Sequence, residues 1–464
     1  MRNTLRHTLS KKLVGWLDTH SEALELSDPS LMIMSVKTFP GRVLYKLFNH
    51  GIETSGKLIN SCDSGGVMMG RSSTRWYHKT FKPSNTGPDG ATWTRVDLRT
   101  DAMTKPGVEM RKAMVEAEVG DDVEGEDPTV NELQEIAADM FQMEDALFVP
   151  TGTMSNLIAV MVHCRERDDE VILGDLSHIH IYEQGGTAQL AGVHTTTVNN
   201  LADGTFDPEQ LESKIRHEYP DPHFPRSRLI CVENTHSVLG GRVLPLSFLK
   251  EVRALADQFG LSVHMDGARL MNAAVAQGVH PSTILQHTDT VSVSLSKGLG
   301  APVGTMLAGP KDFISRAVRC RKALGGGMGQ IGMLAAAGKM SLLENVGRME
   351  EDHRNAKTFA QALLNVGQPL FTLDMATVET NVVRFFIREP GLSPTEFCTR
   401  MAEVGDSEEA ALGQGIQVLM YPYFGNSVRA VWHLGISRED TQLAVRKMQF
   451  VASQYLHLKE KLKV

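Results

Sequence analysis

The chain has 464 residues, enough for two domains with a large buried core, and its 42% hydrophobic and 22% charged residues are typical of a globular protein. Its 47 basic and 55 acidic side chains give a net charge of −8, which argues against a nucleic-acid partner bound through bulk charge. No segment approaches the roughly 18 consecutive apolar residues of a membrane-spanning helix, so we expect no membrane partner.

The N-terminal segment differs in character from the rest. Residues 1–17 carry four basic and no acidic side chains, and leucine recurs at every fourth position from Leu5 to Leu17. This basic, amphipathic pattern is typical of a mitochondrial presequence, although a surface helix or a disordered tail would also show it. Five scattered cysteines without a CxxC pair argue against a disulfide framework or a zinc site and favour a reducing compartment. We therefore expect a cytoplasmic or mitochondrial protein in which residues 1–90 form an extension outside the catalytic fold.

From residue 96 onward, short apolar runs alternate with helical patterns. Asp127 and Pro128 predict a capped helix start, and apolar residues follow at helical spacing as far as Phe141. Helical stretches such as 246–260 separate several strand-like runs, which cover residues 146–150, 170–175, 228–234, 261–267 and 290–296. This alternation predicts an α/β fold with a mostly parallel sheet between two layers of helices.

The pattern changes after about residue 340. A long helical segment is followed by strand-like runs at 379–387 and 427–436, a mixture that predicts a smaller α+β domain. We expect a large domain over residues 91–340 and a small C-terminal domain over residues 341–464.

Polar side chains follow four of the predicted strands, and one of these runs, residues 228–234, leads to His236. In open α/β sheets, ligands bind beyond the carboxyl ends of the strands. The turn at Thr151 leads into a helix whose backbone N–H groups suit a phosphate, although such turns also merely cap helices. A second strand ends at Asp266, and a carboxylate can keep a pyridine nitrogen protonated. A third ends at Lys297, and a desolvated amine can form a Schiff base.

Taken singly, each residue has an ordinary explanation, since Asp266 also fits a cap of the next helix and Lys297 also fits a surface lysine. Together, the phosphate turn, the carboxylate and the amine indicate pyridoxal phosphate as the cofactor. A nicotinamide dinucleotide fits poorly, because the third glycine of Gly298, Gly300 and Gly304 is one residue late and a strand-like run follows it.

These residues belong to a longer series of ordered motifs. The series includes DLRTDAMTKP (97–106), PTGTMSN (150–156), SHIHIYEQGG (177–186), ENTH (233–236), HMDGARLMNA (264–273), SLSKGLGAPVG (294–304), RKALGGGMGQ (321–330) and VRAVWHLGISRED (428–440). With these motifs the sequence resembles the L-threonine aldolase family of pyridoxal-phosphate enzymes, which has the aspartate-aminotransferase fold, known as fold type I. The resemblance covers the chain from about residue 96 to its C-terminus.

The resemblance implies specific roles in cofactor binding. Lys297 would bind the cofactor covalently, Asp266 would pair with its pyridine nitrogen, and Gly152 and Thr153 would hold its phosphate. The resemblance also places Arg269 at the cofactor and His178 over its ring. From the residues alone, a histidine that caps a loop carbonyl is an equally ordinary interpretation of His178.

The same resemblance implies an amino-acid substrate and a reaction. The carboxylate of the substrate would be held by Thr100, Arg269 and Arg429, although Arg429 by itself fits a charge on a strand surface. His236, which might equally cap a loop, would line the β-hydroxyl side of the pocket. The expected reaction cleaves L-threonine or L-allo-threonine into glycine and acetaldehyde, with His178, His236 or a water as the general base. Homodimers or homotetramers are also implied.

Three residues depart from the pattern of the family. Glu124 replaces a tyrosine, Gly329 replaces an arginine expected to help hold phosphate, and Ser237 replaces an asparagine. Loss of an arginine removes a strong donor to phosphate, and a carboxylate near a dianion adds repulsion. A weakened or inactive relative therefore stays an alternative, as does another pyridoxal-phosphate lyase, such as a β-eliminating one.

Overall fold

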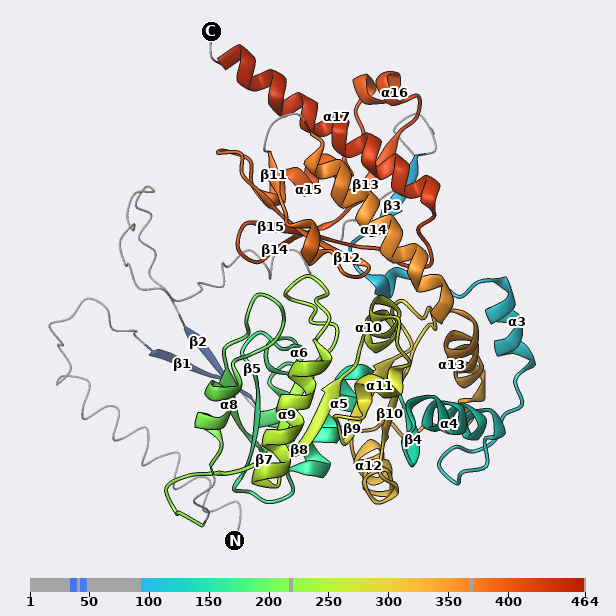
Figure 1. The fold of residues 1–464 in the computed structure, drawn as a ribbon, viewed down its shortest axis with the longest axis vertical. Coiled ribbons are helices and arrows are strands. Elements are labelled where there is room, and N and C mark those ends of the chain that lie inside the picture. Colours follow the sequence, from blue (N-terminus) through green and yellow to red (C-terminus); the bar gives the residue numbers. More distant parts are fainter. Residues whose placement is uncertain (1–33, 40–41, 48–92, 217–219, 367–369, 463–464) are drawn as a thin grey trace, which may run out of the picture. The chain divides into compact units, whose positions relative to one another are not determined.

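The computed structural model describes residues 34–39, 42–47, 93–216, 220–366 and 370–462 (Figure 1). The chain divides into two compact units, Met1–Arg71 and Ser72–Val464. In the first unit, strands β1 (Met34–Phe39) and β2 (Arg42–Leu47) pair antiparallel. The presequence expected over residues 1–17 lies outside the described residues, as does most of the extension expected over residues 1–90.

The second unit contains a sheet of seven strands. The strands β9, β8, β7, β5 and β6 lie side by side in this order, and each is parallel to the next. In contrast, β10 runs antiparallel to both β4 and β9. The prediction of an α/β fold with a mostly parallel sheet is therefore confirmed. In spatial order the strands are β4 (Asp145–Val149), β10 (Thr305–Gly309), β9 (Thr290–Ser294), β8 (Ser262–Asp266), β7 (Arg226–Glu233), β5 (Asp169–Gly174) and β6 (His194–Val198).

Helices follow the strands and cover both faces of this sheet (Figure 1). The first long one, α4, begins as predicted, because the Asp127 carboxylate accepts hydrogen bonds from the backbone of Thr129 and Val130 and Pro128 occupies the first turn. The helices of this part are α3 (Val108–Glu116), α4 (Pro128–Phe141), α5 (Gly152–His163), α6 (His178–Ile181), α7 (Gly186–Gln189), α8 (Pro208–Lys214), α9 (Leu246–Phe259), α10 (Leu270–Gln277), α11 (Pro281–Leu285), α12 (Lys311–Ala323) and α13 (Gly332–Glu344).

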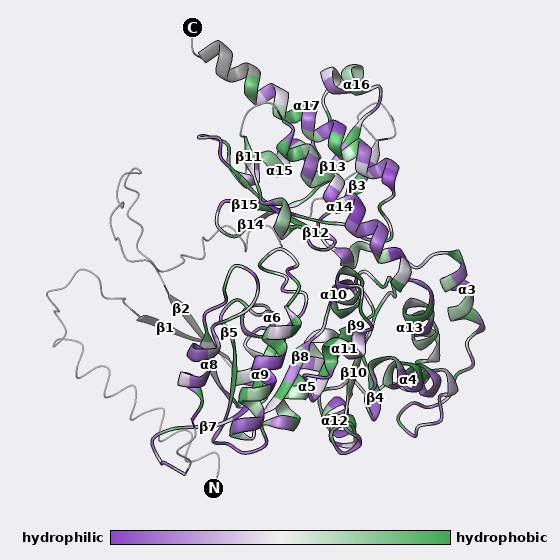
Figure 2. Ribbon diagram, viewed as in Figure 1, coloured by the Kyte–Doolittle hydropathy of each residue, from purple (hydrophilic) through white to green (hydrophobic). Residues whose placement is uncertain are grey.

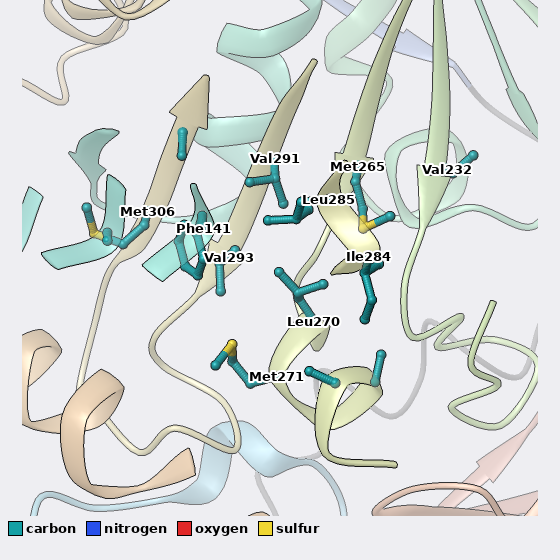
Figure 3. Close-up of a cluster of buried hydrophobic side chains, with 14 of the residues drawn as sticks. Phe141, Val232, Met265, Leu270, Met271, Ile284, Leu285, Val291, Val293 and Met306 are labelled. Atoms are coloured by element: carbon teal, nitrogen blue, oxygen red, sulfur yellow. The ribbon is translucent and has the colours of Figure 1, made fainter. Parts of the chain in front are cut away.

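The two faces of the sheet bury different side chains, because successive residues of a strand point to opposite sides. In β4, Phe148 joins the larger core on one face, and Val149 packs with α5 and α12 on the other. Figure 3 shows the larger core, in which Val291 and Val293 of β9 lie near Leu270 of α10. Figure 2 shows hydrophobic residues along the central strands, whereas the outer helices alternate between hydrophobic and hydrophilic residues.

The C-terminal part has its own sheet and core. Strands β11 (Phe371–Thr372), β12 (Val382–Ile387), β15 (Ser427–Val431) and β14 (Tyr421–Tyr423) form an antiparallel sheet in that order. Strand β3 (Thr94–Asp97) pairs parallel with β13 (Ile416–Leu419), so the start of the second unit contacts its end. Four helices complete this part: α14 (Met349–Leu364), α15 (Pro394–Ala402), α16 (Asp406–Leu412) and α17 (Arg438–Leu462). The predicted boundary between residues 340 and 341 stays a prediction.

Within the described ranges, no helix combines the length and the apolar character that a membrane-spanning helix requires.

Candidate active site

The predicted site residues follow the carboxyl ends of neighbouring strands of the large sheet. Gly152 follows β4, Asp266 ends β8, and Lys297 follows β9. His178 and His236 follow β5 and β7, which continue the same edge. The parallel order of the strands therefore brings five predicted positions to one edge of the sheet, where open α/β sheets bind ligands.

The Lys297 side chain is partly buried, and its amine makes no hydrogen bond or ion pair with any described residue. Burial lowers the pKa of its amine, and the positive charge of Arg269 lowers it further. Nearby carboxylates, including that of Asp266, oppose this shift without reversing it. A lowered pKa increases the fraction of neutral amine, which is the nucleophilic form.

Asp266 is buried, with 3% of its surface exposed. One carboxylate oxygen accepts from the backbone of Ala268 at 3.1 Å, and the other accepts from the Asn156 side chain at 3.0 Å. Helix α10 begins at Leu270 without a side-chain cap, so Asp266 does not act as its cap. A buried carboxylate at a strand end can instead face a ring nitrogen.

His178 is held by carboxylates on two sides. Its Nδ1 lies 2.8 Å from Glu183 Oε1, and its backbone N–H donates to Glu233 Oε2 at 2.7 Å. Burial lowers the pKa of the imidazole, but the hydrogen bond to Glu183 and the negative charges of Asp266 and Glu233 outweigh it, so the pKa is raised. The partner of the ring is thus a carboxylate, and the loop carbonyl considered from the sequence is not involved.

Sequence reasoning missed Glu183, which connects His178 to the rest of the site. Glu183 Oε1 also accepts from the Asn156 side chain at 2.9 Å, and burial raises the pKa of its carboxyl against the opposing effect of His178. Ligand atoms of His178, Glu183 and Asp266 lie within 4.8 Å of one another, a spacing that could suit a metal ion. The hydrogen bonds through Asn156 and His178 account for this close approach.

His236 lies deeper than expected. The residue is 1% exposed and lines a small pocket together with Ser177, Asn200 and Phe206. Neither ring nitrogen has a hydrogen-bond partner among the residues that the structure describes. Its contact with the β-hydroxyl of a substrate therefore stays a prediction.

Arg269 is paired inside the protein. Its guanidinium donates to both carboxylate oxygens of Asp101, at 2.6 and 2.8 Å, and both side chains are buried. Burial alone would raise the pKa of Asp101, but Arg269 holds it well below its usual range. Thr100 precedes this pair and caps the short 3₁₀ helix Asp101–Met103. Asp101 was also missed from the sequence, because no local pattern marks a partner 168 residues away.

Arg429 differs from Arg269 because it forms no ion pair within the described ranges. Its Nη1 donates to the Tyr423 hydroxyl at 3.3 Å, and its guanidinium carbon lies 4.6 Å from the centre of the Tyr423 ring. Its Nε is buried without a partner in the described part of the chain. Arg384 lies directly opposite on β12, and like charges in such pairs are unfavourable unless an anion balances them.

The start of α5 offers features that suit an anion. Thr151 caps the helix by accepting from the backbone of Met154 at 3.1 Å, and Gly152 and Thr153 form its first turn. A side chain at Gly152 would lie 3.5 Å from Ser294 Oγ and 3.8 Å from Thr305 Oγ1. The hydroxyl of Thr305 is buried and has no partner among the described residues. An orphaned hydroxyl beside a positive helix end fits a phosphate.

Two of the three departures from the family pattern lie on contacting loops. The backbone of Asp122 donates to the carbonyl of Gly329 at 3.2 Å, which brings the turn with Glu124 next to the turn with Gly329. Both Glu124 and Gly329 are exposed. The third departure, Ser237, is buried and accepts from Arg269 at 3.2 Å.

Comparisons with known proteins show the family of the chain. The Beta-eliminating lyase family matches residues 97–388. The chain is 49% identical over 288 residues to low-specificity L-threonine aldolase 1 of Arabidopsis thaliana, covering 62% of this chain and 80% of that one. It is 41% identical over 359 residues to the low-specificity L-threonine aldolase of Escherichia coli K12, covering 77% and 99%.

Solved structures show the same fold. The threonine aldolase of Leishmania major superposes with a TM-score of 0.61 at 19% sequence identity, covering 77% of this chain and 99% of that one. The expected fold type is therefore confirmed. The resemblance to L-threonine aldolases is confirmed as well, and the chain belongs to the beta-eliminating lyase family.

Proposed function

We propose that the chain is a pyridoxal-phosphate-dependent lyase that cleaves L-threonine and L-allo-threonine into glycine and acetaldehyde. The observation that carries the proposal is that three groups with the chemistry this reaction requires lie along one edge of the sheet. Lys297 supplies an amine with a lowered pKa, Asp266 supplies a buried carboxylate, and His178 supplies an imidazole backed by Glu183. The names of the relatives support the choice of substrate.

The residues present fit the cofactor. Lys297 would bind its aldehyde carbon, Asp266 its ring nitrogen, and the start of α5 with the Thr305 hydroxyl its phosphate. When bound, pyridoxal phosphate supplies an electron sink for the bond that breaks at Cα of the substrate. Asp266 supports this role, because a buried carboxylate keeps a pyridine nitrogen protonated.

We propose Arg429 as the main group that binds the substrate carboxylate. Its guanidinium forms no ion pair with a described residue, whereas Arg269 is already neutralised by Asp101. Arg269 and Thr100 would then contribute additional hydrogen bonds. A charge-assisted arginine–carboxylate contact orients the substrate as well as binding it, and orientation decides which bond at Cα is cleaved.

His178 is the best-placed general base for the β-hydroxyl proton. Glu183 occupies Nδ1, so Nε2 is the nitrogen that can accept the proton. Help of this kind contributes about 10²–10⁴-fold in rate. His236 stays a second candidate, because its ring nitrogens have no partner in the part of the chain that the structure describes.

The test compares the full chain with Lys297→Ala. We expect the wild-type protein to show a visible absorption band on addition of pyridoxal phosphate and to release acetaldehyde from L-threonine. Both signals should be lost in the variant. A band without acetaldehyde would favour the weakened relative suggested by Glu124 and Gly329. Release of ammonia and a keto acid from serine, without acetaldehyde from threonine, would favour a β-eliminating lyase.

We also propose that the chain forms a homodimer or homotetramer. Helices α3 and α13 pack together and expose large apolar side chains, among them Val108, Val115 and Leu343. Exposed apolar groups that cluster in this way are typical of association surfaces. Light scattering should give a mass of two or four chains, and a monomer at assay concentration would contradict the proposal.

A further inference from the structure

We infer that His264, with Thr290 and His163 behind it, forms a directed chain of hydrogen-bond donors that fixes the side-chain amide of Asn156 and thereby positions Asp266 and Glu183. None of these three residues touches the atoms that react, so they are positioning residues. The inference deepens the proposed function, because it rests on Asp266 and His178 as working groups of the site.

The chain is continuous and buried. Asn156, on α5, is 2% exposed, and its Nδ2 lies 3.0 Å from Asp266 Oδ2 and 2.9 Å from Glu183 Oε1. Behind it, His264 Nε2 lies 3.1 Å from Asn156 Oδ1. His264 and Asp266 are two residues apart on β8, so their side chains share one face of the sheet.

The chain continues onto the neighbouring strand. Thr290 is the cross-strand partner of His264, and its Oγ1 lies 2.9 Å from His264 Nδ1. The same hydroxyl lies 2.9 Å from His163 Nε2, at the end of α5. His264 and Thr290 are fully buried, so water does not compete for these contacts.

The direction of every hydrogen bond follows from the amide. Because two carboxylates face Asn156, its NH₂ group must point at them and its oxygen must point at His264. An amide oxygen only accepts, so His264 Nε2 carries the proton. Burial lowers the pKa of His264 to about 3 and that of His163 to about 4, so both rings are neutral.

The remaining two bonds are then determined. A neutral His264 with a proton on Nε2 must accept at Nδ1, so the Thr290 hydroxyl donates to it. That hydroxyl oxygen in turn accepts from His163 Nε2. The Ser292 hydroxyl, 3.4 Å from His264 Nε2, is a second and weaker acceptor for the same proton. Every donor thus points toward Asp266 and Glu183.

Thr290 is the sharpest place to break the chain. Thr290→Val keeps the shape of the side chain but removes the hydroxyl, so the Nδ1 lone pair of His264 is left buried without a donor. The imidazole then loses the contact that holds it against Asn156, and the amide is less firmly fixed between the two carboxylates. We expect the dissociation constant for pyridoxal phosphate to rise about tenfold, the order expected for one unsatisfied buried polar group. We expect kcat to fall by a similar factor, with KM for threonine unchanged, because Arg429 is not part of the chain.

The matched control is Thr290→Ser, which keeps the hydroxyl and should leave the dissociation constant, kcat and KM at their wild-type values. The experiment also needs a measurement that does not depend on turnover. In protein labelled with ¹⁵N-histidine and free of cofactor, the nitrogen shifts should show His264 neutral with its proton on Nε2, and Thr290→Val should change the Nδ1 shift because that nitrogen loses its hydrogen bond. Thermal melting checks that each variant is folded.

The outcomes separate this inference from the proposed function. If wild-type protein binds the cofactor but releases no acetaldehyde, the tautomer and the dissociation constants still test the chain. If wild type shows His264 protonated on Nδ1, or if folded Thr290→Val keeps both the wild-type Nδ1 shift and the wild-type dissociation constant, the inference is wrong.

Discussion

The contact between His178 and Glu183 should determine the pH dependence of catalysis, so a substitution of Glu183 should change it. The pKa of His178 is raised above its ordinary value of 6.5, because the hydrogen bond to Glu183 and nearby negative charges outweigh burial. A general base acts in its neutral form, so kcat/KM should increase with pH through this raised pKa. Glu183→Gln keeps a hydrogen-bond acceptor but removes the charge, so this rising limb should shift to lower pH.

The measurement is a pH–rate profile of kcat/KM for both proteins at saturating cofactor. The exposed Glu135→Gln serves as control, since it removes one negative charge outside the site. A rising limb at the same pH in wild type and Glu183→Gln would exclude His178 as the group that titrates.

Asp352 gives a residue-scale prediction about stability. Burial, together with repulsion from Asp101, raises its pKa from 3.8 to about 8, and its Oδ2 has no partner in the described ranges. A carboxyl whose pKa is raised on folding stabilises the folded state fully below its unfolded pKa, and this contribution is lost as pH rises through the folded value. The free energy of unfolding should therefore fall between about pH 4 and pH 8.

Asp352→Asn should remove this part of the pH dependence. At pH 8, the free energy of unfolding of the variant should exceed that of wild type by about 1–3 kcal/mol. Urea unfolding of both proteins at several pH values tests this. Parallel stability curves for the two proteins would mean that Asp352 is ionised in the folded state.

At the scale of elements, the contact between the turn with Glu124 and the turn with Gly329 leads to a prediction about cofactor affinity. No atom lies within 4 Å of the position that a side chain at Gly329 would occupy, and the residue is exposed. Gly329→Arg should therefore change stability by less than about 0.5 kcal/mol. The resemblance implies an arginine here that holds phosphate, so the variant should bind pyridoxal phosphate more tightly, by about tenfold.

The control is Gly347→Arg, which adds the same charge at another position with open space. Fluorescence titration with the cofactor gives both dissociation constants. Equal affinities for the two variants and wild type would show that position 329 plays no part in holding phosphate in this chain.

Elements also show what the sequence could and could not predict. The apolar runs that end at Asp266 and Lys297 were recognised because buried parallel strands are continuously apolar. The pairing of β3 with β13 was not, because it joins segments some 320 residues apart without a local signal. Asn156 and Glu183 were visible in motifs, but only the fold shows that both meet Asp266 and His178.

At the scale of the whole second unit, the site depends on contacts between its sheets. Strand β3 pairs with the C-terminal β13 and then leads directly to Asp101, which binds Arg269 of the large-sheet part. Asn381, just before β12, donates to the same carboxylate at 3.3 Å. Correct folding of the C-terminal part is therefore needed to place Asp101 behind the site.

The C-terminal part contains a buried charge cluster whose disruption tests what stabilises this part. Glu408 of α16 pairs with the fully buried Lys447 of α17 and with Arg400 at 2.9 Å. Glu408→Gln would leave the Lys447 amine without a counter-charge, and breaking such a pair costs about 3–5 kcal/mol. Replacing both Glu408 and Lys447 with apolar residues of similar volume should recover most of this loss, because no uncompensated charge then stays buried.

Thermal and urea unfolding of the single and double variants measure the difference, and cofactor affinity serves as the second readout. Because the cluster does not contact Asp101, Arg269 or Lys297, folded protein of each variant should keep wild-type affinity for pyridoxal phosphate. A stable Glu408→Gln protein would show that the Lys447 amine loses its proton once its counter-charge is removed, because burial lowers its pKa to about 8 even with Glu408 opposing the shift. Loss of affinity in folded protein would instead show that α16 and α17 influence the geometry of the site.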